Sequence, residues 1–209
     1  MTETSVEFAK LELALVEAGG LLADLPQHDV GNRLQQLKLK SYVLLCHAAI
    51  EEYLESVSLA VLNDSLVAFE NDSVFRDPLL SACSYYKIVL SEEAPSRQAG
   101  DRCHDLFLIL FKKARSEHVR ALEGINGIKT KDQDAILRPI GVRLMEFDRI
   151  LCQSLNSYGG VRGEIAHQFG VRTVVPRAGQ ERNVWNLFQL LRPLDNMLCE
   201  RHHISFNLV

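Results

Sequence analysis

The stretch that decides the fold is SYVLLCHAAIEEYL, residues 41–54, in which apolar side chains recur every three or four positions. This spacing is that of one face of an α-helix. The stripe continues beyond the quoted stretch and consists of Val43, Cys46, Ile50, Leu54, Val57 and Val61. Asn32, which follows the breakers between Pro26 and Gly31, can cap this helix. Further apolar residues flank the stripe, so we expect a long central helix that is covered on two sides.

Helical periodicity also runs through most of the remaining chain. The first helix should end near Gly19-Gly20 or near Pro26, with Thr4 and Glu7 at the spacing of a capping box. Further helices are predicted over residues 77–90, from Asp101 onward, and over 132–137, 142–155, 162–167 and 181–203. Pro193 should kink or split the last helix, which should bury Trp185, Phe188 and Leu191. We therefore expect an all-α helical bundle with a kinked C-terminal helix and at most one short extended segment, in the β-branched run at 171–176.

Composition places the chain among soluble globular proteins. Of its 209 residues, 47% are hydrophobic and 24% are charged, and no apolar run approaches the roughly 20 residues that span a bilayer. We expect a single domain over residues 1–209, with an N-terminal helix in 1–29 and a core in 30–205, a cytoplasmic location and no membrane contact. The five cysteines are scattered and include no Cys-x-x-Cys pair, so neither a disulfide framework nor a metal cluster is indicated, and Cys46 and Cys152 should be core residues.

A second stretch, YGGVRGEIAH at residues 158–167, carries the functional prediction. It places Arg162 five residues before His167. An arginine keeps its charge near neutral pH, whereas a histidine can take or give a proton there, and the two together suit phosphate chemistry. Gly159 and Gly160 should break the chain before the helix. Arg162 would then lie in the first turn, where unsatisfied amides favour an anion.

Helix geometry separates the two side chains of this motif. Five residues turn an α-helix by about 500°, so Arg162 and His167 point about 140° apart. Two copies that pack these helices about a twofold axis would line one groove with both residues, and we therefore expect a homodimer with a composite site. In such a groove the 2′-hydroxyl of RNA can attack its own phosphate without a metal or other cofactor, with His167 moving protons and Arg162 stabilising charge. Glu164 can orient or tune His167.

The charge of the chain is uneven. The net charge is −4, but residues 1–75 carry 4 basic and 12 acidic side chains, which leaves a net charge of +4 for residues 76–209. Arg172, Arg177 and Arg182 follow the motif and are expected to contact the RNA backbone. Only the C-terminal part of the chain is therefore expected to meet a polyanion.

The motif and its surroundings resemble a known superfamily. Arg162 to His167 match the Arg-x(4–6)-His signature of HEPN domains, and residues 41–54 look like the early HEPN helix with its apolar-apolar-Glu pattern. The region between Gly127 and Arg162 is similar to the branch of ribosome-associated, lectin-phosphatase-linked HEPN nucleases. The resemblance covers roughly residues 30–200.

This resemblance implies a dimeric, metal-independent endoribonuclease that leaves a 2′,3′-cyclic phosphate. It also implies a place in a bacterial toxin–antitoxin or anti-phage defence system, with an antitoxin or defence-system protein as partner. Arg162 and His167 match the functional positions of the motif, and Glu51 matches a supporting acidic position on the early helix. One residue departs from the pattern: active members often carry a polar residue directly after the arginine, and this chain has Gly163. That departure favours the alternative of an inactive HEPN-like dimeric scaffold or regulatory module.

Two further readings remain open from the residues alone. Arg162 can neutralise a carboxylate while His167 packs between helices, and Glu51 can pair with His47 four residues before it. The Glu-x-x-His spacing at 164–167 and at 200–203 is also that of di-iron carboxylate bundles, although no complete set of ligands is visible.

Overall fold

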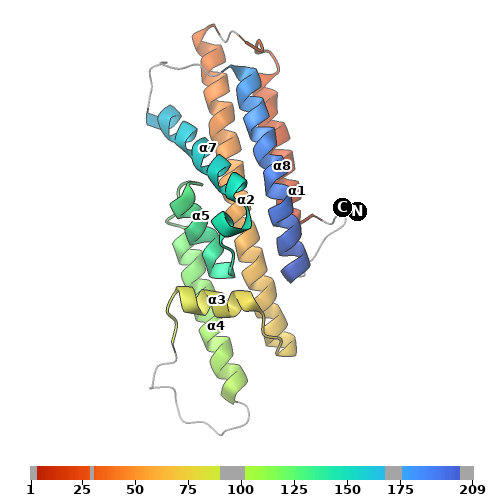
Figure 1. The fold of residues 1–209 in the computed structure, drawn as a ribbon, viewed down its shortest axis with the longest axis vertical. Coiled ribbons are helices and arrows are strands. Elements are labelled where there is room, and N and C mark those ends of the chain that lie inside the picture. Colours follow the sequence, from red (N-terminus) through yellow and green to blue (C-terminus); the bar gives the residue numbers. More distant parts are fainter. Residues whose placement is uncertain (1–3, 29–30, 90–101, 168–175, 203–209) are drawn as a thin grey trace.

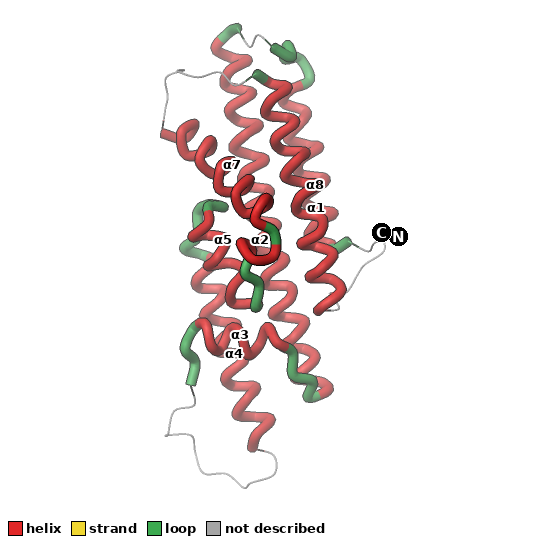
Figure 2. Tube along the Cα trace, viewed as in Figure 1, coloured by secondary structure: helices red, strands yellow, loops and turns green. Residues whose placement is uncertain are grey.

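A computed structural model describes residues 4–28, 31–89, 102–167 and 176–202. Within these ranges the chain is helical, and no strand occurs (Figures 1 and 2). The elements in chain order are α1 Val6–Gly19, the 3-10 turn η1 Gly20–Leu22, α2 Arg33–Asp72, α3 Asp77–Tyr85, α4 Arg102–Leu122, α5 Thr130–Leu137, the 3-10 turn η2 Arg138–Ile140, α6 Leu144–Phe147, α7 Arg149–His167 and α8 Arg177–His202. The expected all-α bundle is confirmed.

The 40-residue helix α2 is the axis of the molecule, as residues 41–54 predicted. Asn32 caps it through a capping box: its side chain accepts from the Gln35 amide at 2.9 Å, and the Gln35 side chain accepts from the Asn32 amide at 3.3 Å. The predicted stripe from Val43 to Val61 is buried, at 1% exposure or less. Cys46 belongs to that stripe, and burial raises the pKa of its thiol to about 12, while Cys152 is equally buried on α7.

The helices α1 and α8 lie beside the N-terminal half of α2, and α3 and α4 pack against its C-terminal half (Figure 1). Phe8 connects the first set of helices, α1, α8 and the N-terminal half of α2. Its ring stacks on Phe188 of α8 at 4.6 Å and meets the Tyr53 ring of α2 edge-on at 5.6 Å. Phe69 of α2 and Phe111 of α4 make the corresponding edge-on contact at 4.9 Å in the second group. Between the two groups, α5 and α7 cross α2, and this crossing positions the candidate site.

Two predicted boundaries were wrong, one at the start of a helix and one at the end of another. The cap of α1 is Ser5 rather than Thr4, with its hydroxyl accepting from the Phe8 amide at 3.0 Å. The helix predicted over 77–90 ends at Tyr85, because Lys87 is left-handed at φ 54° and the Ile88 amide donates back to the Cys83 carbonyl at 2.8 Å.

The C-terminal helix also differs from expectation. Pro193 lies inside α8 and does not split it, since Leu191 and Leu194 on either side are fully buried and hold both halves against the core. Trp185, which we expected to be buried, is 38% exposed, whereas Phe188 and Leu191 are buried as predicted. The expected cap at Asp101 and the extended segment fall outside the described residues, apart from Pro176.

None of the helices within the described ranges has the length and apolar character needed to cross a membrane.

Candidate functional site

Arg162 and His167 both belong to α7, near its C-terminal end rather than its start. The helix begins at Arg149, where the Asp148 carboxylate accepts hydrogen bonds from the amides of Ile150 and Leu151 at 2.8 and 2.9 Å. The predicted helix over 142–155 is therefore divided at Asp148, and its second part runs on to His167. The prediction that unsatisfied N-terminal amides surround Arg162 was wrong, because the first turn of α7 is at Arg149. Arg162 lies near the C-terminal end instead, where the helix dipole favours cations.

The glycines at 159 and 160 do not break the helix. Gly159 is buried where α7 touches the loop before α5: a Cβ atom there would lie 3.1 Å from Cγ of Lys129 and 3.4 Å from Cγ1 of Ile128. The close approach of the loop explains the glycine, although glycine in a helix interior costs roughly 0.5–1 kcal/mol relative to alanine. Packing thus holds this part of α7 in a helix that propensity alone disfavours.

Arg162 continues the row of α7 that faces the core. Leu151, Leu155 and Tyr158 form this row and are at most 3% exposed, and Arg162 follows one turn after Tyr158. Tyr158 fixes the row against α2, since its hydroxyl donates to the Val43 carbonyl at 3.2 Å. The Arg162 side chain is consequently half-buried, and its charge acts on two titratable groups of α2.

Those two groups are His47 and Glu51, whose Nδ1 and Oε2 atoms lie 3.6 Å apart. The pKa of His47 is lowered to about 4, first by burial and then by the Arg162 charge, while Asp132 acts in the opposite direction. His47 is therefore neutral at neutral pH, and its contact with Glu51 is not an ion pair. The sequence reading that brings His47 and Glu51 together is right about their proximity.

The Glu51 side chain is buried enough that its charged form needs stabilising interactions. Burial raises its pKa and Asp132 adds to the rise, whereas the Arg162 charge and a hydrogen bond from the Gly127 amide lower it. The Glu51 side chain is 17% exposed, and its Oε1 atom is buried without a hydrogen-bond partner among the described residues. The region around Arg162 thus contains a buried carboxylate oxygen that can still accept a hydrogen bond.

The loop before α5 forms the other wall of this region. Asp132 accepts from the Lys129 amide at 3.1 Å and would lie 2.8 Å from a Cβ atom on Gly127, so the loop folds tightly around its carboxylate. Gln133, which is 1% exposed, donates to the carbonyls of Ile128 and Cys152 at 2.8 and 3.1 Å and ties the loop to α7. Sequence reasoning missed Asp132 and this loop, and the spacing of Asp132 three residues after Lys129 is the only local signal for it.

The remaining predicted residues are placed as follows. Glu164 is exposed on α7, and Arg182 is exposed on α8. Arg177 contacts the Leu25 carbonyl and forms an ion pair with Glu181 at 3.1 Å, so it joins the segment after α1 to the start of α8. Its role in RNA binding stays a prediction, and these partners argue against it. The Arg172 residue and the side chain of His167 lie outside the described part of the structure.

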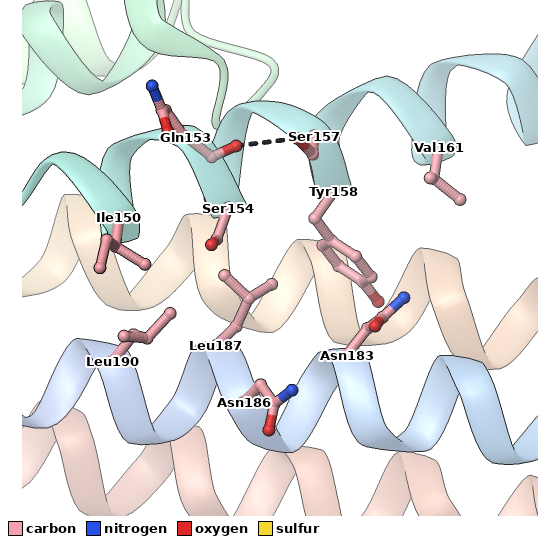
Figure 3. A pocket seen from close by; sticks show the side chains of 10 residues that line it. All are labelled: Ile150, Gln153, Ser154, Ser157, Tyr158, Val161, Asn183, Asn186, Leu187 and Leu190. Carbon is pink, nitrogen blue, oxygen red and sulfur yellow. Dashed lines mark hydrogen bonds between the residues drawn. The ribbon is translucent and has the colours of Figure 1, made fainter.

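A groove of about 330 Å³ lies between α7 and α8, on the row of α7 adjacent to that of Arg162 (Figure 3). Its wall on α7 includes Ser154, Ser157 and Val161, and its wall on α8 includes Asn183 and Leu187. None of the ten lining residues is charged. The groove therefore supplies no charge for a phosphate, and Arg162 on the neighbouring row remains the candidate for that role.

The di-iron alternative gains no support from the described residues. Within that part of the chain, no three or more His, Cys, Asp or Glu side chains are grouped so that they could hold a metal ion. This alternative could use Glu51 or Glu52 on α2, and Glu51 interacts with His47 and Arg162 instead.

Comparison with known proteins identifies the family. A family model described as RiboL-PSP-HEPN matches residues 16–181, a range that includes α2, α5 and α7 with Glu51, Arg162 and His167. Neither the curated proteins nor the solved structures include a match to this chain. Because the family match spans most of the chain and contains the motif that α7 carries, the chain belongs to the RiboL-PSP-HEPN family of the HEPN superfamily.

Proposed function

We propose that this protein is a metal-independent endoribonuclease with Arg162 and His167 in a composite site between two copies of the chain. The observation that carries the proposal is the placement of Arg162: α7 holds it half-buried beside Glu51, on the same helix as His167. Membership of the family supports a nuclease or other RNA-related function. We further propose that the protein acts in the cytoplasm within a toxin–antitoxin or anti-phage system, with an antitoxin or defence-system protein as partner.

The proposed reaction uses the nucleophile that RNA carries. The 2′-oxygen bonds to the adjacent phosphorus while the bond from phosphorus to the 5′-oxygen breaks, which leaves a 2′,3′-cyclic phosphate and a 5′-hydroxyl. The 2′-hydroxyl loses a proton as it attacks, and the leaving 5′-oxygen gains one, so the step is balanced; His167 moves a proton at one of these oxygens. Arg162 stabilises the extra negative charge on the phosphorane oxygens through its fixed fork of donors.

A second copy completes the proposed site. Because α7 is helical through both residues, their positions are about 140° apart around its axis. Two α7 helices that approach about a twofold axis can face Arg162 of one copy towards His167 of the other. Leu37 and Leu44 are exposed and lie at seven-residue steps before Glu51 on α2, so they share its side of that helix and give such an interface apolar surface to bury.

Glu51 has a positioning role in this proposal. A guanidinium placed near a buried carboxylate has already lost rotamer freedom in the folded protein. It therefore loses little further conformational entropy when it binds a phosphate. The Oε1 atom of Glu51, a buried acceptor with no hydrogen-bond partner among the described residues, suits this role. Glu164 is exposed on α7 and keeps its proposed role of orienting or tuning His167. Arg182, which is exposed on α8, is proposed to contact the RNA backbone together with Arg172.

A second candidate function rests on the same electrostatic interaction between Arg162 and Glu51. If Arg162 serves only to stabilise the buried Glu51, the protein is an inactive HEPN-like dimeric scaffold or regulatory module. The two candidates differ in what the loss of Arg162 changes: activity in the first, and stability alone in the second.

The test compares Arg162→Ala, His167→Ala and Arg149→Ala. Arg149 is an exposed arginine at the other end of α7 and serves as the matched control. On single-stranded RNA in the presence of EDTA, the first two variants should lose cleavage by at least about 100-fold, in line with the removal of a charge-stabilising or proton-transfer group, while Arg149→Ala keeps it. A parent protein that cleaves no RNA would leave the scaffold as the function. An Arg162→Ala variant that cleaves like the parent would show that the active site does not include Arg162.

A further inference from the structure

Lys129 lies across α7 at the place where Gly163 leaves space. Its backbone is fixed, because its amide donates to Asp132 at 3.1 Å and the next residue, Thr130, donates through its amide and hydroxyl to Asn156 on α7 at 3.3 Å. Contacts with α7 therefore fix the backbone position from which the Lys129 side chain extends.

The lysine stem follows one row of α7 towards the C-terminal end of the helix. Its Cγ atom lies 3.1 Å from the place of a Cβ on Gly159, and its Nζ atom lies 4.0 Å from the place of a Cβ on Gly163, one turn further on. A Cβ on Gly159 would crowd the lysine stem, whereas a Cβ on Gly163 would be in ordinary van der Waals contact with the amine. Gly159 thus allows an amine from the α5 loop to reach the turn that contains Arg162.

The position of the amine around the helix is informative. If Arg162 defines 0°, each residue adds about 100°, so Gly163 lies at about 100° and position 167 at about 140°. The Nζ atom beside Gly163 is therefore in the sector between Arg162 and position 167. Lys129 is exposed, and within the described ranges it makes no ion pair shorter than 4.0 Å.

We infer that Lys129 is a further phosphate-binding residue of the proposed ribonuclease site, where its amine supplies the polar group that the helix lacks at Gly163. This inference rests on the proposed function. The amine contributes a second positive charge beside Arg162, delivered from a different element. A phosphate held by both would lie in the sector that faces position 167.

A structural role for the same amine makes a different prediction. The end of a helix attracts cations through its unpaired carbonyls, so Lys129 could serve only to stabilise the last turns of α7. In that case its removal lowers the stability of the protein and leaves the ionic component of RNA binding unchanged. The salt dependence of binding separates the two roles, because each phosphate contact releases counterions.

The experiment uses the full-length chain and a labelled, mixed-sequence single-stranded RNA, with His167→Ala as the background so that the RNA stays intact. Lys129→Met is compared with Lys131→Met, an equal loss of charge at an exposed residue in the first turn of α5. We expect Lys129→Met to reduce the slope of log K against log salt concentration by about 0.7 between about 50 and 200 mM salt. Lys131→Met should keep the slope, and Lys129→Arg should restore it.

In the background with an intact His167, Lys129→Met should also slow RNA cleavage more than Lys131→Met does. Equal slopes and equal cleavage for the two methionine variants overturn the inference, as does a Lys129→Met variant that loses only stability to urea. A parent protein that neither binds nor cleaves RNA overturns the proposed function itself. The two failures are distinguishable because the first requires an active parent.

Discussion

At the scale of single residues, Asp195 shows how a buried carboxylate is held by hydrogen bonds alone. It is fully buried on α8 and accepts from the Ser5 amide at 2.8 Å, the Ser5 hydroxyl at 2.5 Å and the Tyr53 hydroxyl at 3.1 Å. Cys199 adds a weaker thiol donor at 3.8 Å. The cap of α1, the middle of α2 and the end of α8 therefore meet at one side chain. Burial, followed by the charge of Asp195, raises the pKa of Tyr53.

Replacing Asp195 with asparagine should destabilise the fold. The amide nitrogen is itself a donor, so at least one of the donors that now reach the carboxylate would be buried without an acceptor, at a cost of about 2 kcal/mol. Urea denaturation monitored by circular dichroism measures this loss. Asp24→Asn is the control, since the Asp24 side chain is 87% exposed, and it should change stability by less than about 0.5 kcal/mol. A free energy of unfolding equal to that of the control would show that the Asp195 network contributes nothing.

The residues of the candidate site were only partly predictable from sequence. Arg162 and His167 form a local motif, and the proximity of His47 to Glu51 follows from their spacing on one helix. Asp132 and Lys129 reach the same region through a loop that tertiary contacts with α7 hold in place, and no local pattern encodes such contacts. Of the two glycines that predicted a helix break, Gly159 is explained by that contact, whereas Gly160 has open space beside it.

At the scale of elements, α7 shows why glycine misled the sequence reading. Periodicity and propensity treat Gly159 and Gly160 alike, as residues that weaken a helix. The structure separates them: Gly159 packs against Ile128 and Lys129, whereas no atom lies within 4 Å of a Cβ built on Gly160. The long helices α2 and α8 were predictable because their periodicity persists over many turns, while the ends of α3 and α7 depend on single residues, Lys87 and Asp148.

The two glycines make a matched pair for a stability test. Gly160→Ala should stabilise the protein by about 0.5–1 kcal/mol, because alanine loses less backbone entropy in a helix and its methyl group has open space. Gly159→Ala should gain less or become destabilising, since its Cβ would lie 3.1 Å from the Lys129 stem. Thermal and urea unfolding of both variants measure the difference. Equal stabilisation by the two substitutions would mean that the α5 loop does not constrain this face of α7.

At the scale of the whole molecule, two buried histidines couple stability to pH. His118 of α4 is fully buried between two hydroxyls, with Nε2 3.0 Å from Ser58 and Nδ1 2.9 Å from Tyr86. The Ser58 hydroxyl donates to the Glu55 carbonyl, so Nε2 carries the ring proton and Nδ1 accepts from Tyr86. In this neutral tautomer both ring nitrogens and both hydroxyls have a hydrogen-bond partner. Burial lowers the pKa of His118 to about 4. His47 has a pKa of about 4 as well.

The direction of the pH dependence follows from these values. An unfolded histidine takes up a proton below about pH 6.5, whereas folded His118 and His47 remain neutral down to about pH 4, so the unfolded state binds more protons in that window. Each histidine therefore lowers the free energy of unfolding as pH falls from about 6.5 to about 4. Glu55 opposes them, because burial, Glu51 and Glu52 raise its pKa to about 7, and the folded state binds its proton first. The free energy of unfolding of the parent protein therefore varies with pH as the sum of these opposing contributions.

A variant isolates the contribution of one histidine from this sum. His118→Gln keeps a neutral donor and acceptor but cannot titrate, so its free energy of unfolding should fall less steeply than that of the parent, by about 1.4 kcal/mol per pH unit within the window from about 4 to 6.5. Above that window the two curves should run parallel, offset by whatever the substitution costs in packing. Urea titrations at half-unit intervals of pH would test this, and parallel curves for His118→Gln and the parent would mean that His118 is protonated equally in the folded and unfolded states.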